Sequence, residues 1–206
     1  MERAVATIDR AALVHNLARV RDLAPAREVF AAVKADGYGH GAGVVATTLA
    51  EAGCDGFAVS SLDEALQLRW AGITRPIMTL SQPLTADVLA AMGEHAITPV
   101  IFERAHLAAL ADYRGPELAA WLKLDSGMHR LGFPAYEARA LTTDIKAMAQ
   151  VRLAGCMTHL GCADDPRDPL THHQLACFDE ALAGLDVPRS IANSAGVIAW
   201  PASRAD

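Results

Sequence analysis

Seven short apolar runs recur along the chain, and segments with helical periodicity separate them. The runs are Val29–Ala35, Gly56–Ser60, Pro76–Leu80, Ile97–Phe102, Ala120–Leu124, Leu153–His159 and Arg189–Asn193. Strand-length runs that are apolar almost throughout are typical of parallel sheets that helices cover on both faces. The alternation of strands with helices therefore predicts a chain built from βαβ units around a parallel sheet.

The segments between these runs carry helix signals. The predicted helices are Val44–Ala50, Leu62–Trp70, Ala86–Met92, Arg104–Leu110, Tyr136–Met148 and Leu170–Leu185. Ser61, with Glu64 three residues later, forms a capping-box signature at the start of the second of them. At the N-terminus, Ala4–Ile8 predicts a short strand, and Asp9 predicts the N-cap of the helix that follows it.

This pattern favours a (β/α)8 barrel of the TIM type over a doubly wound nucleotide-binding sheet. The chain has no G-x-G-x-x-G sequence after its first strand, which the doubly wound alternative would need. We count seven strands rather than eight, and the chain stops shortly after the seventh. We therefore expect one incomplete α/β barrel domain over residues 1–206, truncated after its seventh strand.

Composition narrows the classes of partner. The chain has 206 residues, 52% of them hydrophobic, and a formal net charge of −6, which argues against nucleic acid because phosphate binding needs a basic face. No apolar run reaches membrane-spanning length and no secretory signal is visible. The four cysteines lack the spacing of a disulfide scaffold. The expected location is the cytoplasm, with no nucleic acid or membrane partner.

The first apolar run ends in Lys34, which a loop containing Gly37, Gly39 and Gly41 follows. A strand end, a glycine loop and a helix start together suit a phosphate group held beside an amine. A lysine amine forms a Schiff base with a carbonyl cofactor, and pyridoxal phosphate carries both an aldehyde and a phosphate. The alternative is an ordinary surface lysine, although the chain has only three lysines against fifteen arginines.

Further polar residues follow the other predicted strands, at the end of a barrel where chemistry takes place. They are Tyr38 after the first strand, Lys123, Asp125 and Arg130 after the fifth, His159 after the sixth, and Asn193 and Ser194 after the seventh. The alternatives are solvated charges at strand ends, a half-buried packing role for Tyr38 and a helix N-cap for Ser194. Two positive charges, Lys123 and Arg130, favour an anion on this rim or modification of the lysine into one.

A zinc site is an alternative interpretation of the residues around the sixth predicted strand. Cys156, His159 and Cys162 are spaced like zinc ligands, with His172, His173 and Cys177 further along the chain. In a strand, however, alternation sends Cys156 and His159 to opposite faces. We therefore expect no metal site.

Residues 32–41, Ala-Val-Lys-Ala-Asp-Gly-Tyr-Gly-His-Gly, resemble the pyridoxal-phosphate attachment signature of the alanine racemases, which are fold-type III enzymes. Residues 123–132, Lys-Leu-Asp-Ser-Gly-Met-His-Arg-Leu-Gly, resemble the second block of that family. Thr158-His159 and Asn193-Ser194 follow in the family's order.

The resemblance implies a role for each of these residues. Lys34 would hold the cofactor as an aldimine and act as one of two acid/base groups, while Tyr38 and Ser194 would bind the phosphate. Arg130 would contact the cofactor phenolate and the substrate carboxylate, with Lys123, often carbamylated in this family, fixing Arg130. His159 would belong to the hydrogen-bond layer beneath the pyridine ring, and Asn193 would neighbour the phosphate site.

The implied reaction interconverts L-alanine and D-alanine through a pyridoxal-phosphate aldimine and a carbanion, and supplies D-alanine for peptidoglycan. Family members are longer homodimers, in which a C-terminal β domain supplies a second base to the partner's site. This chain is expected to lack that β domain and, with it, the second base. The alternatives are a non-catalytic pyridoxal-phosphate carrier of the single-domain barrel type and a decarboxylase of the same fold type.

Overall fold

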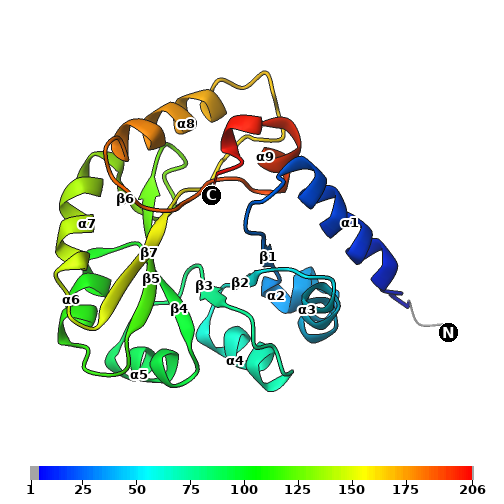
Figure 1. Cartoon of the computed structure of the whole chain (residues 1–206), viewed down its shortest axis with the longest axis horizontal. Coiled ribbons are helices and arrows are strands. Elements are labelled where there is room, and N and C mark those ends of the chain that lie inside the picture. Colours follow the sequence, from blue (N-terminus) through cyan, green and yellow to red (C-terminus); the bar gives the residue numbers. More distant parts are fainter. Residues whose placement is uncertain (1–4, 206) are drawn as a thin grey trace. The chain divides into compact units, whose positions relative to one another are not determined.

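The computed structural model describes residues 5–205, and the chain divides into two compact units, Met1–Leu80 and Ser81–Asp206. Within each unit, strands alternate with helices in chain order (Figure 1). The strand pairs within both units are parallel. The predicted βαβ organisation is therefore confirmed in each unit.

Among its described residues, the first unit holds a parallel sheet in the order β1-β2-β3. Its elements are α1 (Arg10–Leu23), β1 (Phe30–Ala32), α2 (Lys34–Tyr38), α3 (Ala42–Glu51), β2 (Gly56–Val59), α4 (Leu62–Trp70) and β3 (Ile77–Thr79). Phe57 of β2, Leu68 of α4 and Ile77 of β3 are fully buried. These apolar strands form the centre of the unit because helices cover them.

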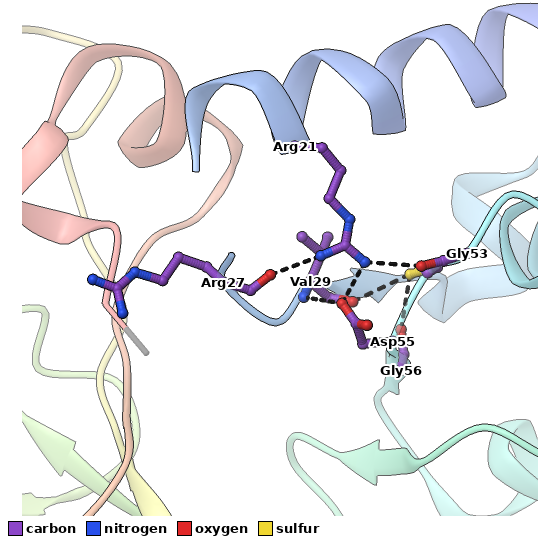
Figure 2. Close-up of polar contacts among 7 residues, drawn as sticks. Arg21, Arg27, Val29, Gly53, Asp55 and Gly56 are labelled. Atoms are coloured by element: carbon purple, nitrogen blue, oxygen red, sulfur yellow. Dashed lines mark hydrogen bonds and ion pairs between the residues drawn. The ribbon is translucent and has the colours of Figure 1, made fainter. Parts of the chain in front are cut away.

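Arg21 of α1 ties the chain segments that lead into β1 and β2 (Figure 2). Its guanidinium donates to the carbonyl oxygens of Arg27 at 2.7 Å and Gly53 at 2.8 Å. It also pairs with the carboxylate of Asp55 at 2.5 Å, which in turn accepts a hydrogen bond from the Val29 N–H at 2.7 Å. One cation therefore satisfies backbone groups at the start of two neighbouring strands, which fixes α1 on the sheet.

The second unit holds a parallel sheet in the order β4-β5-β7-β8, with β6 paired to the end of β5. Its strands are β4 (Ile97–Ile101), β5 (Leu118–Asp125), β6 (Phe133–Pro134), β7 (Val151–Met157) and β8 (Arg189–Ser190). Its helices are α5 (Ala86–Glu94), α6 (Arg104–Asp112), η1 (Ala135–Glu137), α7 (Ala138–Lys146), α8 (Leu170–Ala181), α9 (Ser194–Ala199) and η2 (Pro201–Ser203). Leu122 and Leu124 of β5 and Phe178 of α8 are fully buried.

All seven predicted strand positions form strands, but several boundaries differ. β1 ends at Ala32, so Lys34 begins a turn instead of ending the strand. The predicted strand Ala4–Ile8 is wrong for residues 5–8, while Ala4 lies outside the described residues. A strand needs a neighbour for its backbone N–H and C=O groups, and no strand of the described chain pairs with residues 5–8. Asp9 caps α1 as expected, accepting from the N–H groups of Ala11 and Ala12.

β7 ends at Met157, so His159 lies beyond the strand on which the alternation argument against zinc was based. Within residues 5–205, no three His, Cys, Asp or Glu side chains gather closely enough to hold a metal ion. None of the described helices is long and apolar enough to span a membrane.

His106 of α6 is a buried titratable group, with 1% of its surface exposed. Its ring packs edge-on against Phe102 with the ring centroids 4.3 Å apart, and its Nε2 lies 3.1 Å from the Glu103 carboxylate. Burial lowers the pKa of His106, and the nearby Glu103 charge only partly opposes this shift. The folded protein therefore binds a proton at His106 less readily than the unfolded chain, whose histidine pKa is about 6.5.

We expect acid to destabilise the chain through His106. Above the unfolded pKa the histidine is neutral in both states and its contribution to stability is complete; that contribution is lost as the pH falls from there toward the lower folded pKa. The thermal midpoint should fall less between pH 7.5 and pH 5.5 in His106→Gln than in the wild type. His15→Gln, at an exposed position of α1, is the control and should behave as the wild type. Equal pH dependence in all three proteins would contradict the prediction.

Candidate active site

The turn that begins at Lys34 is left-handed. The φ angles are 50° at Ala35, 53° at Asp36, 64° at Gly37 and 54° at Tyr38. Each L-residue in such a conformation costs roughly 1–2 kcal/mol, and a turn of this kind persists only when its surroundings hold it. Strained backbone of this sort clusters at functional sites. The sequence predicted a glycine loop here, but three residues with side chains also adopt positive φ.

Several hydrogen bonds hold this turn. The Gly37 N–H donates to the Val33 carbonyl at 2.8 Å, and the Gly39 N–H donates to the Ala35 carbonyl at 3.0 Å. The Asp36 carboxylate accepts a hydrogen bond of 2.7 Å from the N–H of Ala42, the first residue of α3. The glycine loop is thereby joined directly to the helix after it.

The turn leaves two predicted site residues accessible. Lys34 is half-buried at its start, and the Tyr38 side chain is 59% exposed at its end. Tyr38 is therefore not the half-buried packing residue of the alternative interpretation. Among the described residues its hydroxyl has no hydrogen-bond partner, so it is free to donate to a ligand.

In the second unit, three predicted site residues line one small pocket. Lys123, near the end of β5, is 7% exposed, and it shares the pocket with Arg130 and His159. Arg130 is exposed and His159 half-buried. The structure thus brings together the two cations and the imidazole that follow β5 and β7.

Asp125, the last residue of β5, shapes the loop that carries Arg130. Its carboxylate accepts hydrogen bonds from the N–H groups of Gly127 at 2.9 Å and His129 at 3.0 Å, and it pairs with the His129 ring at 2.9 Å. Burial alone would raise the pKa of the Asp125 carboxyl, but these bonds outweigh burial and lower it. An Asp two residues before a Gly is a local turn signal that identifies this role.

Gln174 of α8 positions the chain around His159, and the sequence analysis missed it. Its side-chain amide donates to the His159 carbonyl at 2.8 Å, and its side-chain oxygen accepts from the Gly161 N–H at 2.8 Å. Gln174 is fully buried beside a hydrogen bond between Ser126 and Thr158. The one sequence feature that could have identified Gln174 is its place as a polar residue among the apolar positions of the predicted helix Leu170–Leu185.

We expect Gln174→Met to lower the free energy of unfolding by roughly 1–3 kcal/mol, because it leaves two backbone groups without their partner. Urea unfolding measures this change. The control is Thr171→Val in the same helix, which is equally buried and whose hydroxyl has no hydrogen-bond partner among the described residues. Equal losses in both variants would contradict the prediction.

Asn193 and Ser194 lie at the start of α9. The Asn193 side chain caps this helix by accepting from the Gly196 N–H at 2.9 Å, and it donates to the Leu160 carbonyl at 3.1 Å. The N-cap is therefore Asn193 and not Ser194, which corrects the alternative interpretation of Ser194. Ser194 is exposed, and within residues 5–205 its hydroxyl has no partner.

Each unit, taken by itself, contains groups that suit an aldehyde or an anion. Lys34 provides a primary amine on a strained turn, and Tyr38 and Ser194 provide hydroxyl donors that no other described residue occupies. Arg130 provides an exposed guanidinium, which binds carboxylates and phosphates well. This donor set fits pyridoxal phosphate.

The family profile and the similar sequences point to the same protein family. The sequence profile described as "Alanine racemase, N-terminal domain" matches residues 8–206. The chain is 44% identical to an alanine racemase of Halorhodospira halophila, covering 100% of this chain and 57% of that protein. It is 47% identical to one of Thioalkalivibrio sulfidiphilus, covering 100% of this chain and 58% of that protein. The chain thus spans less than two thirds of the length of these curated relatives.

Solved structures agree with these relatives. The crystal structure of the biosynthetic alanine racemase from Pseudomonas aeruginosa matches with a TM-score of 0.92 and 41% identity, over 98% of this chain and 56% of that one. The alanine racemase from Corynebacterium glutamicum matches with a TM-score of 0.89 and 31% identity, over 97% of this chain and 59% of that one. The expected fold class, the α/β fold of a TIM-type barrel, is confirmed. From its sequence and its fold alike, this chain belongs to the alanine racemase N-terminal domain family.

Proposed function

We propose that this chain is the pyridoxal-phosphate-binding part of an alanine racemase, an isomerase that interconverts L-alanine and D-alanine. The observation that carries the proposal is Lys34 at the start of a strained turn, in a chain of this family. When bound, pyridoxal phosphate supplies the electron sink that makes the α-proton of an amino acid acidic. The product would serve peptidoglycan synthesis in the cytoplasm, and the full-length form would be a homodimer.

Lys34 has two tasks in this proposal. Its Nζ would hold the cofactor through the aldehyde, and the same amine, once the substrate amine has replaced it there, would take or return the α-proton on its side of the substrate. A second group on the opposite side is needed for inversion, and none of the residues assigned here fills that role.

The remaining residues bind and orient. In the first unit, Tyr38 would donate its hydroxyl to the phosphate. In the second unit, Ser194 would be a phosphate donor, at the start of α9 that Asn193 caps. Arg130 would pair with the substrate carboxylate and the cofactor phenolate. Lys123, buried in the same pocket, orients Arg130, directly or as its carbamate. His159 would hydrogen-bond in the layer that supports the pyridine ring.

Exchange of the alanine α-proton with solvent deuterium tests the proposal. The purified chain, loaded with pyridoxal phosphate and given D- or L-alanine in D2O, should label one enantiomer faster than free pyridoxal phosphate does. Chiral chromatography of the same samples reports inversion separately. Covalent cofactor binding without exchange above the free-cofactor rate would favour the carrier alternative instead.

A further inference from the structure

Glu64 of α4 contacts the turn that carries Lys34, although it belongs to the next β/α unit. Its Oε1 accepts a hydrogen bond of 2.7 Å from the N–H of Ala35, the residue after Lys34. Its Oε2 accepts one of 2.6 Å from the N–H of Ser60, just past the end of β2. One carboxylate thus connects the chain after β1 to the chain after β2.

The start of α4 fixes this carboxylate in place. The Glu64 N–H donates to the Ser61 hydroxyl at 3.4 Å, which is the expected half of the capping box. The fully buried Ala65 and Leu68 hold α4 within the first unit. The capping-box glutamate therefore reaches beyond its own helix start, to the turn at Lys34.

The turn needs such a contact. Ala35 and Asp36 have φ angles of 50° and 53°, a conformation that an unrestrained chain leaves readily. Hydrogen bonds from N–H groups to a charged carboxylate are stronger than those to neutral acceptors. The Ala35 N–H is the backbone donor nearest to Lys34 on its C-terminal side, so the bond to Glu64 limits rotation of the Lys34–Ala35 peptide.

We propose that Glu64 is a positioning residue for Lys34: its carboxylate holds the left-handed turn and thereby sets the direction in which the lysine amine leaves the sheet. The proposal rests on the proposed function, because it assigns Lys34 as the group that captures the cofactor. Glu64 itself touches neither cofactor nor substrate in this role.

Removing Glu64 takes away both a negative charge and two hydrogen bonds, and the two effects on cofactor capture must be distinguished. Removing a carboxylate near a site for an anion should by itself help an anion to bind. Asp63 lies beside Glu64 in the first turn of α4, is exposed, and has no partner among the described residues. Asp63→Asn therefore removes the same charge without touching the turn, and it is the matched control for Glu64→Gln.

The experiment measures covalent capture at Lys34. The chain is mixed with pyridoxal phosphate, and borohydride reduces the bond formed when the amine adds to the aldehyde and one water leaves. Mass spectrometry of the Lys34 peptide then gives the initial rate. We expect a decrease of roughly tenfold or more in Glu64→Ala, a smaller decrease in Glu64→Gln, which keeps one acceptor oxygen, and no decrease in Asp63→Asn. Pyridoxal, which lacks the phosphate, should show the same order.

Amide hydrogen exchange of residues 34–41 without cofactor gives the second readout. Exchange should accelerate by roughly tenfold or more in Glu64→Ala and stay unchanged in Asp63→Asn.

Wild-type capture rates in Glu64→Ala and Glu64→Gln would overturn the inference while leaving the proposed function intact. So would faster exchange without slower capture. Absence of capture at Lys34 in the wild type would instead overturn the proposed function, and this inference with it. If Glu64→Ala does not fold, Glu64→Gln decides both readouts.

Discussion

Lys34→Ala should abolish covalent capture of pyridoxal phosphate and reduce α-deuterium exchange of alanine by about 10²–10⁴-fold, the contribution typical of a positioned acid/base group. The substitution removes the one group that would both hold the aldehyde and move the proton. Intact-protein mass spectrometry after borohydride reduction measures the first effect, and NMR of alanine in D2O measures the second. Lys34→Arg keeps the positive charge but cannot condense with the aldehyde, so it should fail in the same way.

The chain offers a matched control for this experiment. Lys146 is exposed in the last turn of α7, and Lys146→Ala should retain both capture and exchange. Lys123, the third lysine, is buried in the pocket with Arg130. A Lys34→Ala protein that still gains the cofactor mass, on Lys123 or Lys146, would show that the amine assignment is wrong.

Gly132→Ala should lower the free energy of unfolding by about 2–6 kcal/mol, combining the cost of a strained φ with that of overpacking. Gly132 has a φ of +120°, and an added Cβ would lie 2.9 Å from the Asp125 nitrogen and 3.0 Å from the Leu124 carbonyl carbon. Both atoms belong to the backbone of β5, which is paired with β6 and β7 and cannot move without losing hydrogen bonds. The Arg130 loop should therefore shift away from β5.

Urea unfolding of Gly132→Ala measures the loss, and amide exchange of residues 125–132 locates it. Gly72 also has a positive φ, 86°, but nothing lies within 4 Å of its added Cβ. Gly72→Ala therefore introduces backbone strain without overpacking, and its free energy of unfolding should fall by about 1–3 kcal/mol. If the two variants lose the same stability, close packing against β5 does not limit position 132.

The sequence predicted the strands well because parallel strands buried on both faces are almost entirely apolar. Helix α4 was predicted with its observed bounds, since the Ser61 cap marks its start. The prediction of a strand over Ala4–Ile8 was wrong for residues 5–8, because an apolar segment forms a strand only where a neighbouring strand can pair with it. Local patterns could not supply that partner.

Motifs in the sequence identified the candidate site residues, but not the residues that hydrogen-bond to the backbone beside them. Lys123, Arg130 and His159 meet in one pocket as the strand-end argument implies. Glu64 and Gln174 act through hydrogen bonds to backbone groups that lie 29 and 13 to 15 residues away. Such contacts leave no periodic or compositional trace, so only the folded chain identifies them.

The left-handed turn restricts which amino acids can follow Lys34. With φ near +50°, positions 35 and 36 disfavour every β-branched side chain, whatever its polarity. Glycine would relieve the strain there, but it would also widen the range of conformations open to the unfolded chain and to the turn itself. Variation at these two positions is therefore limited by backbone handedness, even though neither side chain is assigned any chemistry.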